Sequence, residues 1–427
     1  MSRIGGEDLV ARDATSCRLC GADVTTTLVD LGMSPLCESF LTVAELDRVE
    51  HYYPLHALVC GKCLLAQLKE YVRPDAIFRE YAYFSSYSSS WVAHAKAYCE
   101  MIVRRLRLGP QSLVVELASN DGYLLQNFGP LGIPCLGVEP AVNVANVAIG
   151  KGIQTLTEFF GTALANQLLR SGKQADLIVA NNVLAQVPNL NDFVAAIKIL
   201  LKPTGLVTLE FPHLERLMAE VQFDTIYHEH FSYFSLMSTD FLARRNELKL
   251  IDVERLPTHG GSLRVYLAHE QSNHRQSAFV GTLLEQERRA GLHDLAGYAT
   301  FSARVRATKR KLLSCLIALK NQKKRICGYG APGKGNTLLN YCGIGPDFLD
   351  FTVDRNPYKV GRFTPGMRVP ILPVEALEKA RPEYILILPW NLQREILGQM
   401  EHVAAWGGKF IVPIPDVKII DTKDSLI

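Results

Sequence analysis

Residues 112–118 (SLVVELA) form a short apolar run that passes into four small or polar residues, 119–122, and then into a helical pattern. A strand, a tight turn and a helix in this order are the first unit of a doubly wound α/β sheet. Further apolar runs alternate with helical patterns, and they predict the second to fifth strands at residues 134–138, 154–156, 176–180 and 205–210. The chain is therefore expected to fold around a mainly parallel sheet.

The turn after the first strand differs from the phosphate-binding pattern G-x-G-x-x-G, because Ala118 and Asn120 stand where glycines would be. Without that cradle, NAD is disfavoured here and a cofactor without phosphates is favoured. The second strand ends at Glu139, about twenty residues after the turn, where an acid accepts hydrogen bonds from ribose hydroxyls. The sequence thus predicts a nucleoside-type cofactor at this edge of the sheet.

A helix near residues 239–246 and two strands, 249–254 and 262–269, follow the five alternating units. This order resembles the class I S-adenosylmethionine-dependent methyltransferase fold, in which a final hairpin adds an antiparallel strand. The resemblance implies three groups of donor-binding residues: Glu116, Ser119, Asn120, Asp121 and Gly122 at the amino-acid part, Glu139 at the ribose, and Phe159, Phe160, Asn181 and Asn182 near the adenine and sulfonium. For the last group, ordinary packing of the sheet is the alternative.

Residues 222–235 (QFDTIYHEHFSYFS) are too polar for a core strand and too aromatic for a solvated loop. Tyr227, His228, Glu229 and His230 are consecutive in this stretch. Histidines beside a carboxylate and enclosed by rings suit the removal of a proton from a weak carbon acid. A buried aromatic turn, whose histidines only satisfy backbone groups, is the alternative.

The place of this stretch in the fold favours chemistry. It begins about twelve residues after the predicted fifth strand, and ligands of open α/β sheets lie beyond the carboxyl ends of the strands. By the same reasoning His259, in the turn of the final hairpin, and Gln186, after the fourth strand, are expected to face this edge.

Two pairs of cysteines, Cys17 with Cys20 and Cys60 with Cys63, are separated by 39 residues. Each C-x2-C spacing lets two thiolates from one turn reach a tetrahedral zinc ion, and the neighbouring Gly21 and Gly61 suit tight knuckles. Four thiolates leave no open coordination position, so the zinc is expected to be structural.

Residues 81–91 (YAYFSSYSSSW) alternate aromatic and hydroxyl side chains before a helix expected at 91–108. They suit either an ordinary strand or a wall that hydrogen-bonds a polyhydroxyl or phosphorylated ligand. Near the C-terminus, a long helix is expected at 300–324, followed by strands at 325–329, before Asp354, and at 384–389.

The first of these C-terminal strands leads into GYGAPGKGNT, in which Gly328, Gly330 and Gly333 fit G-x-G-x-x-G and Lys334 adds a positive charge. Glycines between a strand and a helix let backbone N–H groups approach phosphate oxygens. Pro332 is unusual in that pattern. The segment predicts either a nicotinamide-binding Rossmann unit or an ancillary domain whose glycines only permit a tight turn.

Composition limits the class of protein. The 427 residues are 48% hydrophobic, enough for two or three domains, and the net charge of +3 does not favour a nucleic-acid or membrane partner. The first residues show no charged segment followed by an apolar one, and the six cysteines outside the two pairs are scattered. These features favour a cytoplasmic protein.

The chain as a whole resembles the C-methyltransferases that act on nucleotide-linked 4-keto-deoxysugars, close to the C-3 methyltransferases of branched-sugar biosynthesis. The resemblance runs from the cysteine pairs through YAYFSSYSSSW, VVELASNDGYLL, NNVLAQVPNLNDF, EFPHL, QFDTIYHEHFSYFS, LPTHGGSLRVY and GYGAPGKGNT. It implies a zinc-binding domain (1–75), an S-adenosylmethionine-binding domain (76–270) and a Rossmann-like domain (271–427), with the nucleotide sugar held between domains. A monomer or a small homo-oligomer is expected.

The resemblance also implies residue roles. His230 would be the general base, with Tyr227 and Glu229 as partners. The other residues expected at the sugar nucleotide are His228, His259, Tyr81, Tyr83, Ser85, Ser86, Lys334, Asn336 and Thr337. The family pattern has a histidine where this chain has Gln186, and a glutamine can form hydrogen bonds but cannot exchange a proton near neutral pH.

The expected reaction is methylation of C-3, next to the ketone of a 4-ketosugar linked to a nucleotide, with dTDP as the expected carrier. Methylation at C-5 is one alternative. An NAD-dependent oxidoreductase or epimerase centred on the Gly328 loop is another, and a non-catalytic or nucleic-acid-binding zinc protein is a third.

Overall fold

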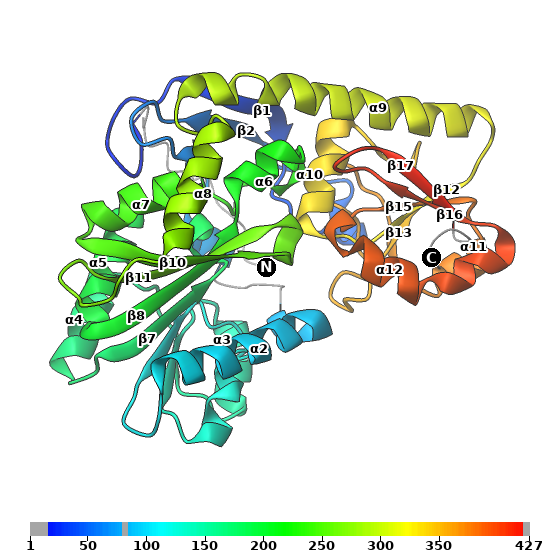
Figure 1. Cartoon of the computed structure of the whole chain (residues 1–427). Coiled ribbons are helices and arrows are strands. Elements are labelled where there is room, and N and C mark those ends of the chain that lie inside the picture. The colour runs from blue at the N-terminus through cyan, green and yellow to red at the C-terminus, as the bar shows by residue number, and fades with distance from the viewer. Residues whose placement is uncertain (1–15, 79–83, 422–427) are drawn as a thin grey trace.

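The computed structural model describes residues 16–78 and 84–421, which form a four-stranded, a seven-stranded and a six-stranded sheet. In Figure 1 the N-terminal sheet lies above the seven-stranded sheet, and the C-terminal sheet lies beside them. The long helix α9 (Phe301–Asn321) runs along both the N-terminal and the C-terminal sheets.

The seven-stranded central sheet has the order β10-β11-β8-β7-β4-β5-β6. Its strands are β4 (Val114–Leu117), β5 (Cys135–Val138), β6 (Thr155–Leu156), β7 (Ala175–Asn181), β8 (Leu201–Pro212), β10 (Leu248–Leu256) and β11 (Ser262–His269). Only β11 is antiparallel to its neighbours. All seven predicted strands are present, and the order is that of the class I methyltransferase fold. The helix expected after the first turn is not formed, because two short 3-10 helices, Leu125–Asn127 and Gly129–Leu131, stand there instead.

Helices cover both faces of this sheet (Figure 1). They are α2 (Ser89–Leu106), α3 (Val142–Gly150), α4 (Thr162–Arg170), α5 (Leu190–Leu200), α6 (Leu214–Ala219), α7 (Leu236–Arg245) and α8 (Ala278–Arg289). Parallel strands covered on both faces are continuous apolar runs, which explains why the sequence predicted them well.

The N-terminal sheet has the order β1-β2-β3-β9. It comprises β1 (Thr26–Ser34), β2 (Tyr53–Val59), β3 (Ala66–Leu68) and β9 (Ser232–Tyr233), with helix α1 (Pro74–Phe78) after it. The first three strands were not predicted, because two irregularities in the β1–β2 register interrupt the alternation of apolar residues. β9 belongs to the stretch 222–235, so this candidate catalytic segment completes the N-terminal sheet.

The C-terminal sheet has the order β14-β13-β12-β15-β16-β17 and is parallel except for β17. Its elements are β12 (Ile326–Tyr329), α10 (Gly333–Cys342), β13 (Thr352–Val353), β14 (Ile371–Leu372), α11 (Ala376–Ala380), β15 (Tyr384–Ile387), α12 (Gln393–Gln399), β16 (Lys409–Val412) and β17 (Lys418–Asp421). β14, β16 and β17 were not predicted.

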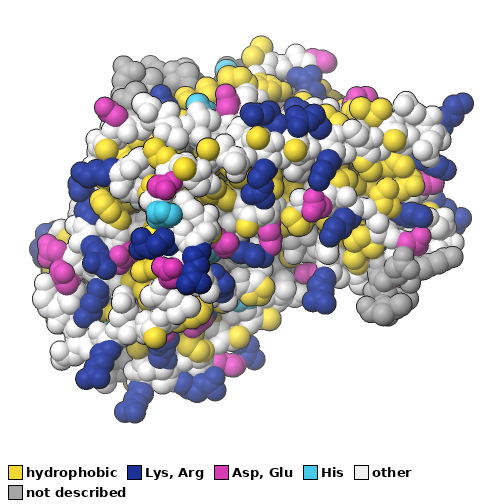
Figure 2. All heavy atoms as spheres, turned by 45° about the horizontal axis from the view of Figure 1, so that its top comes forward, with side chains coloured by type: hydrophobic (Ala, Val, Ile, Leu, Met, Phe, Trp, Pro, Cys, Tyr) yellow, Lys and Arg dark blue, Asp and Glu magenta, His cyan; other side chains and the backbone are white. Residues whose placement is uncertain are grey.

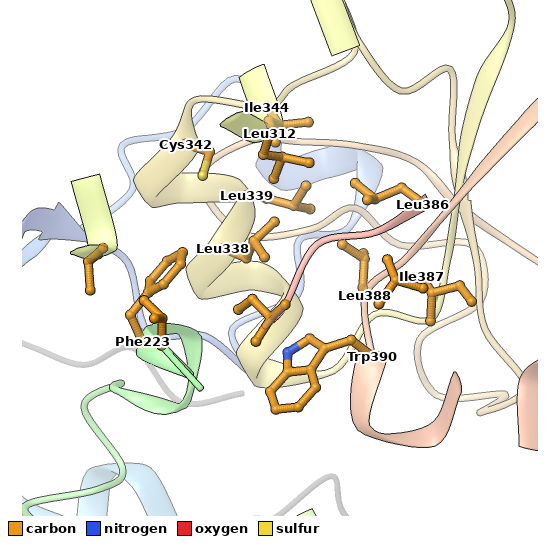
Figure 3. Close-up of a cluster of buried hydrophobic side chains, with 14 of the residues drawn as sticks. Phe223, Leu312, Leu338, Leu339, Cys342, Ile344, Leu386, Ile387, Leu388 and Trp390 are labelled. Carbon is orange, nitrogen blue, oxygen red and sulfur yellow. The ribbon is translucent and has the colours of Figure 1, made fainter. Parts of the chain in front are cut away.

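One hydrophobic core joins the N-terminal and C-terminal sheets through α9 and α10, and it includes Phe223 and Ile226 of the candidate catalytic stretch. Figure 3 shows part of this core around α10, with Phe223 on one side and Leu386, Ile387, Leu388 and Trp390 on the other. The candidate catalytic stretch is therefore anchored in the packing between two sheets.

On the face shown in Figure 2, Lys and Arg side chains are spread among acidic and apolar ones rather than gathered in one patch. Within the described ranges, every helix is too short or too polar to span a bilayer.

Candidate functional site

Four thiols converge at the turn that joins β2 and β3 of the N-terminal sheet. The sulfur atoms of Cys17, Cys20, Cys60 and Cys63 all lie within 4.8 Å of one another, and two of the distances between pairs are 3.5 Å. This spacing fits one tetrahedral zinc ion bound by four thiolates, with no open position.

The two zinc knuckles use different residues for the same turn. Gly21 follows the first pair with φ +77°, and its N–H donates to the Cys17 carbonyl (2.9 Å). In the second knuckle the corresponding residue is Leu64, with φ +59° and an N–H bond to the Cys60 carbonyl (2.9 Å). Gly61 lies within the second turn, as expected, but the left-handed residue of this knuckle is the one directly after the last cysteine.

The turn after β4 has left-handed residues at Ala118 (φ +53°), Asn120 (φ +50°) and Gly122 (φ +76°). A side chain at Gly122 would overlap Ile153. Non-glycine residues in this conformation cost free energy and are concentrated at functional sites. The turn therefore has the backbone that a glycine loop would adopt, with side chains added to it.

Buried polar atoms without partners gather at this edge. Among the described residues, Glu116 Oε2, Ser119 Oγ, Asp121 Oδ1 and both side-chain polar atoms of Asn181 lack a hydrogen-bond partner. Burial raises the pKa of Glu116 well above its ordinary value. Unsatisfied buried polar atoms are rare and costly, so a polar ligand such as S-adenosylmethionine, with its amino-acid and ribose groups, fits this edge.

Glu139 links the ends of β4 and β5. Its Oε2 accepts from the Asn120 N–H (2.9 Å) and its Oε1 from the Ala141 N–H (2.8 Å), so the carboxylate holds the turn. Each carboxylate oxygen has a second lone pair that can accept from a ribose hydroxyl.

The other predicted donor residues lie as follows. Asn182 has φ +54°, and its amide donates to His259 Nε2 (3.3 Å). Phe160 packs against Phe193 of α5, with 5.6 Å between the ring centres, whereas Phe159 is 47% exposed and lies open to a ligand.

The serines of YAYFSSYSSSW lie against the donor turn. The Ser85 N–H donates to Asn120 Oδ1 (2.9 Å), and both the N–H and the hydroxyl of Ser86 donate to Asp121 Oδ2. Tyr81 and Tyr83 lie outside the described residues. The segment after them therefore forms a wall of the donor edge.

His230 has a defined tautomer. Its Nδ1 lies 3.1 Å from the Thr225 carbonyl, which can only accept, so Nδ1 carries the proton and Nε2 has a free lone pair. Burial lowers the pKa of His230 to about 4, so the ring is neutral at pH 7. The Tyr227 ring lies 4.1 Å from the imidazole, centre to centre. This arrangement suits a general base beside a phenol.

The neighbours of His230 turn elsewhere. His228 Nε2 donates to the Pro54 carbonyl (3.2 Å) and its ring packs against Tyr53, so it lies under the N-terminal sheet rather than with His230. Glu229 is buried and accepts from the Cys37 thiol (3.7 Å).

The hairpin of β10 and β11, through His259, and helix α10, through Lys334, also contribute residues near His230. His259 has φ +53° and packs edge-on against Trp91. Burial lowers the pKa of His259 to about 4, and the charge of Lys334 lowers it further. The Lys334 charge also contributes to the low pKa of His230. Lys334 packs on the Trp390 ring (5.0 Å), and the same ring lies against Gly260, the residue after His259. Gln186 is partly exposed at the end of the 3-10 helix Leu184–Gln186, beside β9.

Asn336 and Thr337 bind the chain itself. The Asn336 amide donates to the Cys37 carbonyl (2.6 Å), and the Thr337 hydroxyl donates to the Gly333 carbonyl (3.3 Å). Of the three residues predicted on this helix, Lys334 alone is brought to the histidines.

The sequence analysis missed a polar cluster at the end of β8. Glu210 is fully buried and accepts from His94 (3.1 Å), Arg264 (3.0 Å) and Thr258 (3.0 Å). Burial alone would raise the pKa of Glu210, but the hydrogen bond from His94 and the charge of Arg264 lower it. The sequence did contain a sign of this cluster, because Glu210 is an acid at the end of a predicted strand, 205–210, that is otherwise mostly apolar.

The glycine loop of the C-terminal sheet is filled by the N-terminal part of the chain. Glu38 forms an ion pair with Lys359 (3.2 Å) and faces the Gly333 N–H, and Lys359 also donates to the Ala331 carbonyl (2.9 Å). Burial alone would lower the pKa of Lys359, but the charge of Glu38 raises it. A phosphate at this loop would have to displace the Glu38 carboxylate.

Taken together, the strand order, the polar edge of the central sheet and the four-thiol cluster define an S-adenosylmethionine-dependent methyltransferase with a zinc-binding N-terminal module. Family models match in three segments: a zinc binding domain at residues 17–78, a methyltransferase domain at 91–253 and a C-methyltransferase C-terminal domain at 257–415.

The chain is 34% identical to the C-methyltransferase NovU of Streptomyces niveus over 420 residues, which is 98% of this chain and 99% of that protein. The protein belongs to the C-methyltransferase family.

Solved structures resemble part of the chain. The PH0226 protein of Pyrococcus horikoshii OT3 is 13% identical, with a TM-score of 0.36, over 44% of this chain and 95% of that one. Magnesium protoporphyrin IX methyltransferase of Synechocystis PCC 6803 is 14% identical, with a TM-score of 0.32, over 42% of this chain and 81% of that one.

Proposed function

We propose that this C-methyltransferase methylates C-3, next to the ketone, of a nucleotide-linked 4-keto-deoxysugar, with dTDP as the carrier, in branched deoxysugar biosynthesis. The observation that supports this most is His230, a neutral imidazole whose Nε2 is free to accept a proton near the donor edge. Methylation of carbon needs such a base, because a carbon nucleophile forms only when a C–H proton is removed.

In this proposal His230 Nε2 takes the proton from the ring carbon next to the ketone, and the C–H electrons pass to the ketone oxygen. When bound, S-adenosylmethionine supplies a methyl group that this carbon can take from the positive sulfur, which leaves as a thioether. The Thr225 carbonyl stabilises the imidazolium that results, because it accepts the Nδ1 proton (3.1 Å). The chain's part is to align base, carbon and methyl group.

Tyr227 is the proposed donor to the oxygen that becomes negative, either directly or through a relay with Glu229. Its ring stacks against the base at 4.1 Å, so its hydroxyl and the imidazole reach the same region. A phenol placed at a developing oxyanion stabilises the transition state more than the ground state.

We further propose the division into a zinc-binding domain (1–75), a donor-binding domain (76–270) and a C-terminal domain (271–427) that helps to hold the nucleotide sugar. Lys334 supports this, because it brings a positive charge from the C-terminal sheet to His230 and His259. The zinc ion takes no part in the chemistry.

The test is incubation with S-adenosylmethionine that carries a labelled methyl group and a panel of nucleotide-linked 4-ketosugars, with the label located by mass spectrometry and NMR. Label on C-3 supports the proposal, and label on C-5 replaces it with the alternative regiochemistry. Donor binding without transfer to any ketosugar would contradict the proposed substrate class.

A further inference from the structure

Asp224 is a buried carboxylate at the start of the catalytic stretch. Its Oδ2 accepts from the Trp390 indole N–H (2.6 Å), and its Oδ1 has no hydrogen-bond partner among the described residues. The side chain is 0% exposed. A carboxylate in such a place is costly unless a positive charge compensates it.

Lys334 supplies that charge from the other side of the same indole. Its Nζ lies 5.0 Å from the centre of the Trp390 rings and donates to Asn391 Oδ1 (2.9 Å). Thus the N–H edge of Trp390 binds the acid, and its face binds the ammonium. The cation–π contact with Trp390 and the hydrogen bond to the neutral amide of Asn391 hold Lys334 in place. Neither of them compensates the lysine charge as a carboxylate does.

The pKa directions agree with this arrangement. Burial raises the pKa of Asp224 to about 6, and the charge of Lys334 opposes the rise. Burial lowers the pKa of Lys334, and Asp224 opposes that fall. The other titratable groups that face the pair are His230 and His259, on the side of Lys334, and Cys342, on the side of Asp224.

The indole of Trp390 lies between the hairpin and α10. A side chain at Gly260 would come within 2.8 Å of the indole, so the hairpin closes directly on it. Figure 3 shows the indole beside the start of α10, with Phe223 across the helix. The residue after Asp224 is Thr225, whose carbonyl holds His230 Nδ1. Any movement of the Asp224 backbone would therefore also move the Thr225 carbonyl that holds the imidazole of His230.

We propose that Asp224 is a positioning residue that keeps Lys334 charged and in place, through Trp390, for an anionic oxygen of the substrate. The inference rests on the proposed function, which supplies two such oxygens: the enolate oxygen formed at the ketone and those of the diphosphate. An ammonium near His230 also disfavours protonation of the base before the reaction.

The decisive variant is Asp224→Asn, which keeps the shape and the acceptor for the indole N–H but removes the charge. We expect the basic limb of the pH profile of kcat/KM to move down by about one pH unit or more, because Lys334 then loses its proton more easily. The acid limb should stay near pH 4, because burial lowers the pKa of His230 to about 4. Asp416→Asn, an exposed acid paired with Lys311, is the matched control and should leave the profile unchanged.

A second measurement does not depend on turnover. Pulse acetylation at a series of pH values, read by mass spectrometry, gives the pH at which Lys334 becomes reactive. We expect that pH to fall in Asp224→Asn and to stay at the wild-type value in Asp416→Asn. Unchanged Lys334 reactivity in folded Asp224→Asn would overturn the inference, even if methyl transfer to a ketosugar were established.

The variant Lys334→Met shows whether Lys334 faces the enolate oxygen or the diphosphate oxygens of the substrate. A fall in kcat with unchanged binding of the nucleotide diphosphate assigns Lys334 to the enolate oxygen, and weaker diphosphate binding assigns it to the diphosphate; both support the proposal. Wild-type kcat and diphosphate affinity in Lys334→Met would contradict it. If the wild-type protein methylates no ketosugar, the proposed function fails while the acetylation result still stands.

Discussion

The central and C-terminal sheets begin in the same way. In each sheet a strand ends in a turn, which is followed by two short 3-10 helices in the central sheet and by α10 in the C-terminal sheet. In each sheet an acid directly after the second strand accepts hydrogen bonds from a backbone N–H of that turn and from the N–H of the residue two positions further on. Glu139 accepts from Asn120 N–H (2.9 Å) and Ala141 N–H (2.8 Å), and Asp354 accepts from Ala331 N–H (2.7 Å) and Asn356 N–H (2.8 Å).

What lies in front of these turns differs. At the central turn Ser119 Oγ and Asp121 Oδ1 still lack partners among the described residues, whereas the C-terminal turn is filled by Glu38 and Lys359. The glycine sequence of the second turn correctly indicated an anion site, but a carboxylate of the same chain lies there. The local sequence of a turn thus allows a ligand-binding site to form. Whether a ligand can reach that site depends on a distant segment of the chain, here the one that carries Glu38.

The largest expected effect concerns His230, the proposed base at the central edge. His230→Asn should lower turnover by roughly a thousandfold, because a general base is worth about 10²–10⁴ in rate, while donor binding by calorimetry stays intact. His402→Asn, in a cavity of about 710 Å³ at the carboxyl edge of the C-terminal sheet, should keep wild-type turnover. Near-normal turnover of His230→Asn would remove His230 from this role.

The next effect concerns the zinc module, which contacts both sheets through β9 and Glu38. Cys60→Ser, or removal of zinc by a chelator, should unfold β1 to β3 and release β9, since small zinc modules depend on the metal for folding. Loss of activity together with loss of one zinc equivalent is expected, whereas Cys315→Ser, at a half-buried cysteine of α9, should retain both. Full activity after complete zinc removal would refute the dependence.

A paired substitution tests the comparison directly. Glu139→Gln should weaken S-adenosylmethionine binding by about tenfold, the loss of roughly one charged hydrogen bond. Asp354→Asn, the equivalent change in the C-terminal sheet, should leave donor affinity unchanged and lower the melting temperature by a few degrees. Equal effects on donor affinity would mean that the two edges are not functionally distinct.

The smallest expected effect is at the filled turn. Glu38→Ala should destabilise the fold by about 2 kcal/mol, because it leaves Lys359 without its partner, as measured by denaturant unfolding. Wild-type protein should not bind NADH in a fluorescence titration, since Glu38 lies where a diphosphate would be. Binding of NADH by the wild-type protein would instead favour the oxidoreductase alternative.

Local sequence patterns determined the central sheet, the long helix α9 and the two cysteine pairs. Apolar strands buried on both faces and C-x2-C spacings have signals within a few residues, and the acids at the strand ends could be found in the same way. The stretch around His230 was found because several unusual residues are adjacent in it.

Only the tertiary structure decided which of these residues meet. β9 pairs with β3, Glu38 fills the loop before α10, and Asp224 shares Trp390 with Lys334, all between segments far apart in the chain. His228, adjacent to Glu229 and two residues from His230, turns away to Pro54. Adjacent residues can face opposite directions, and charge pairs across domains leave no periodic pattern, so such contacts depend on the packing of the whole chain.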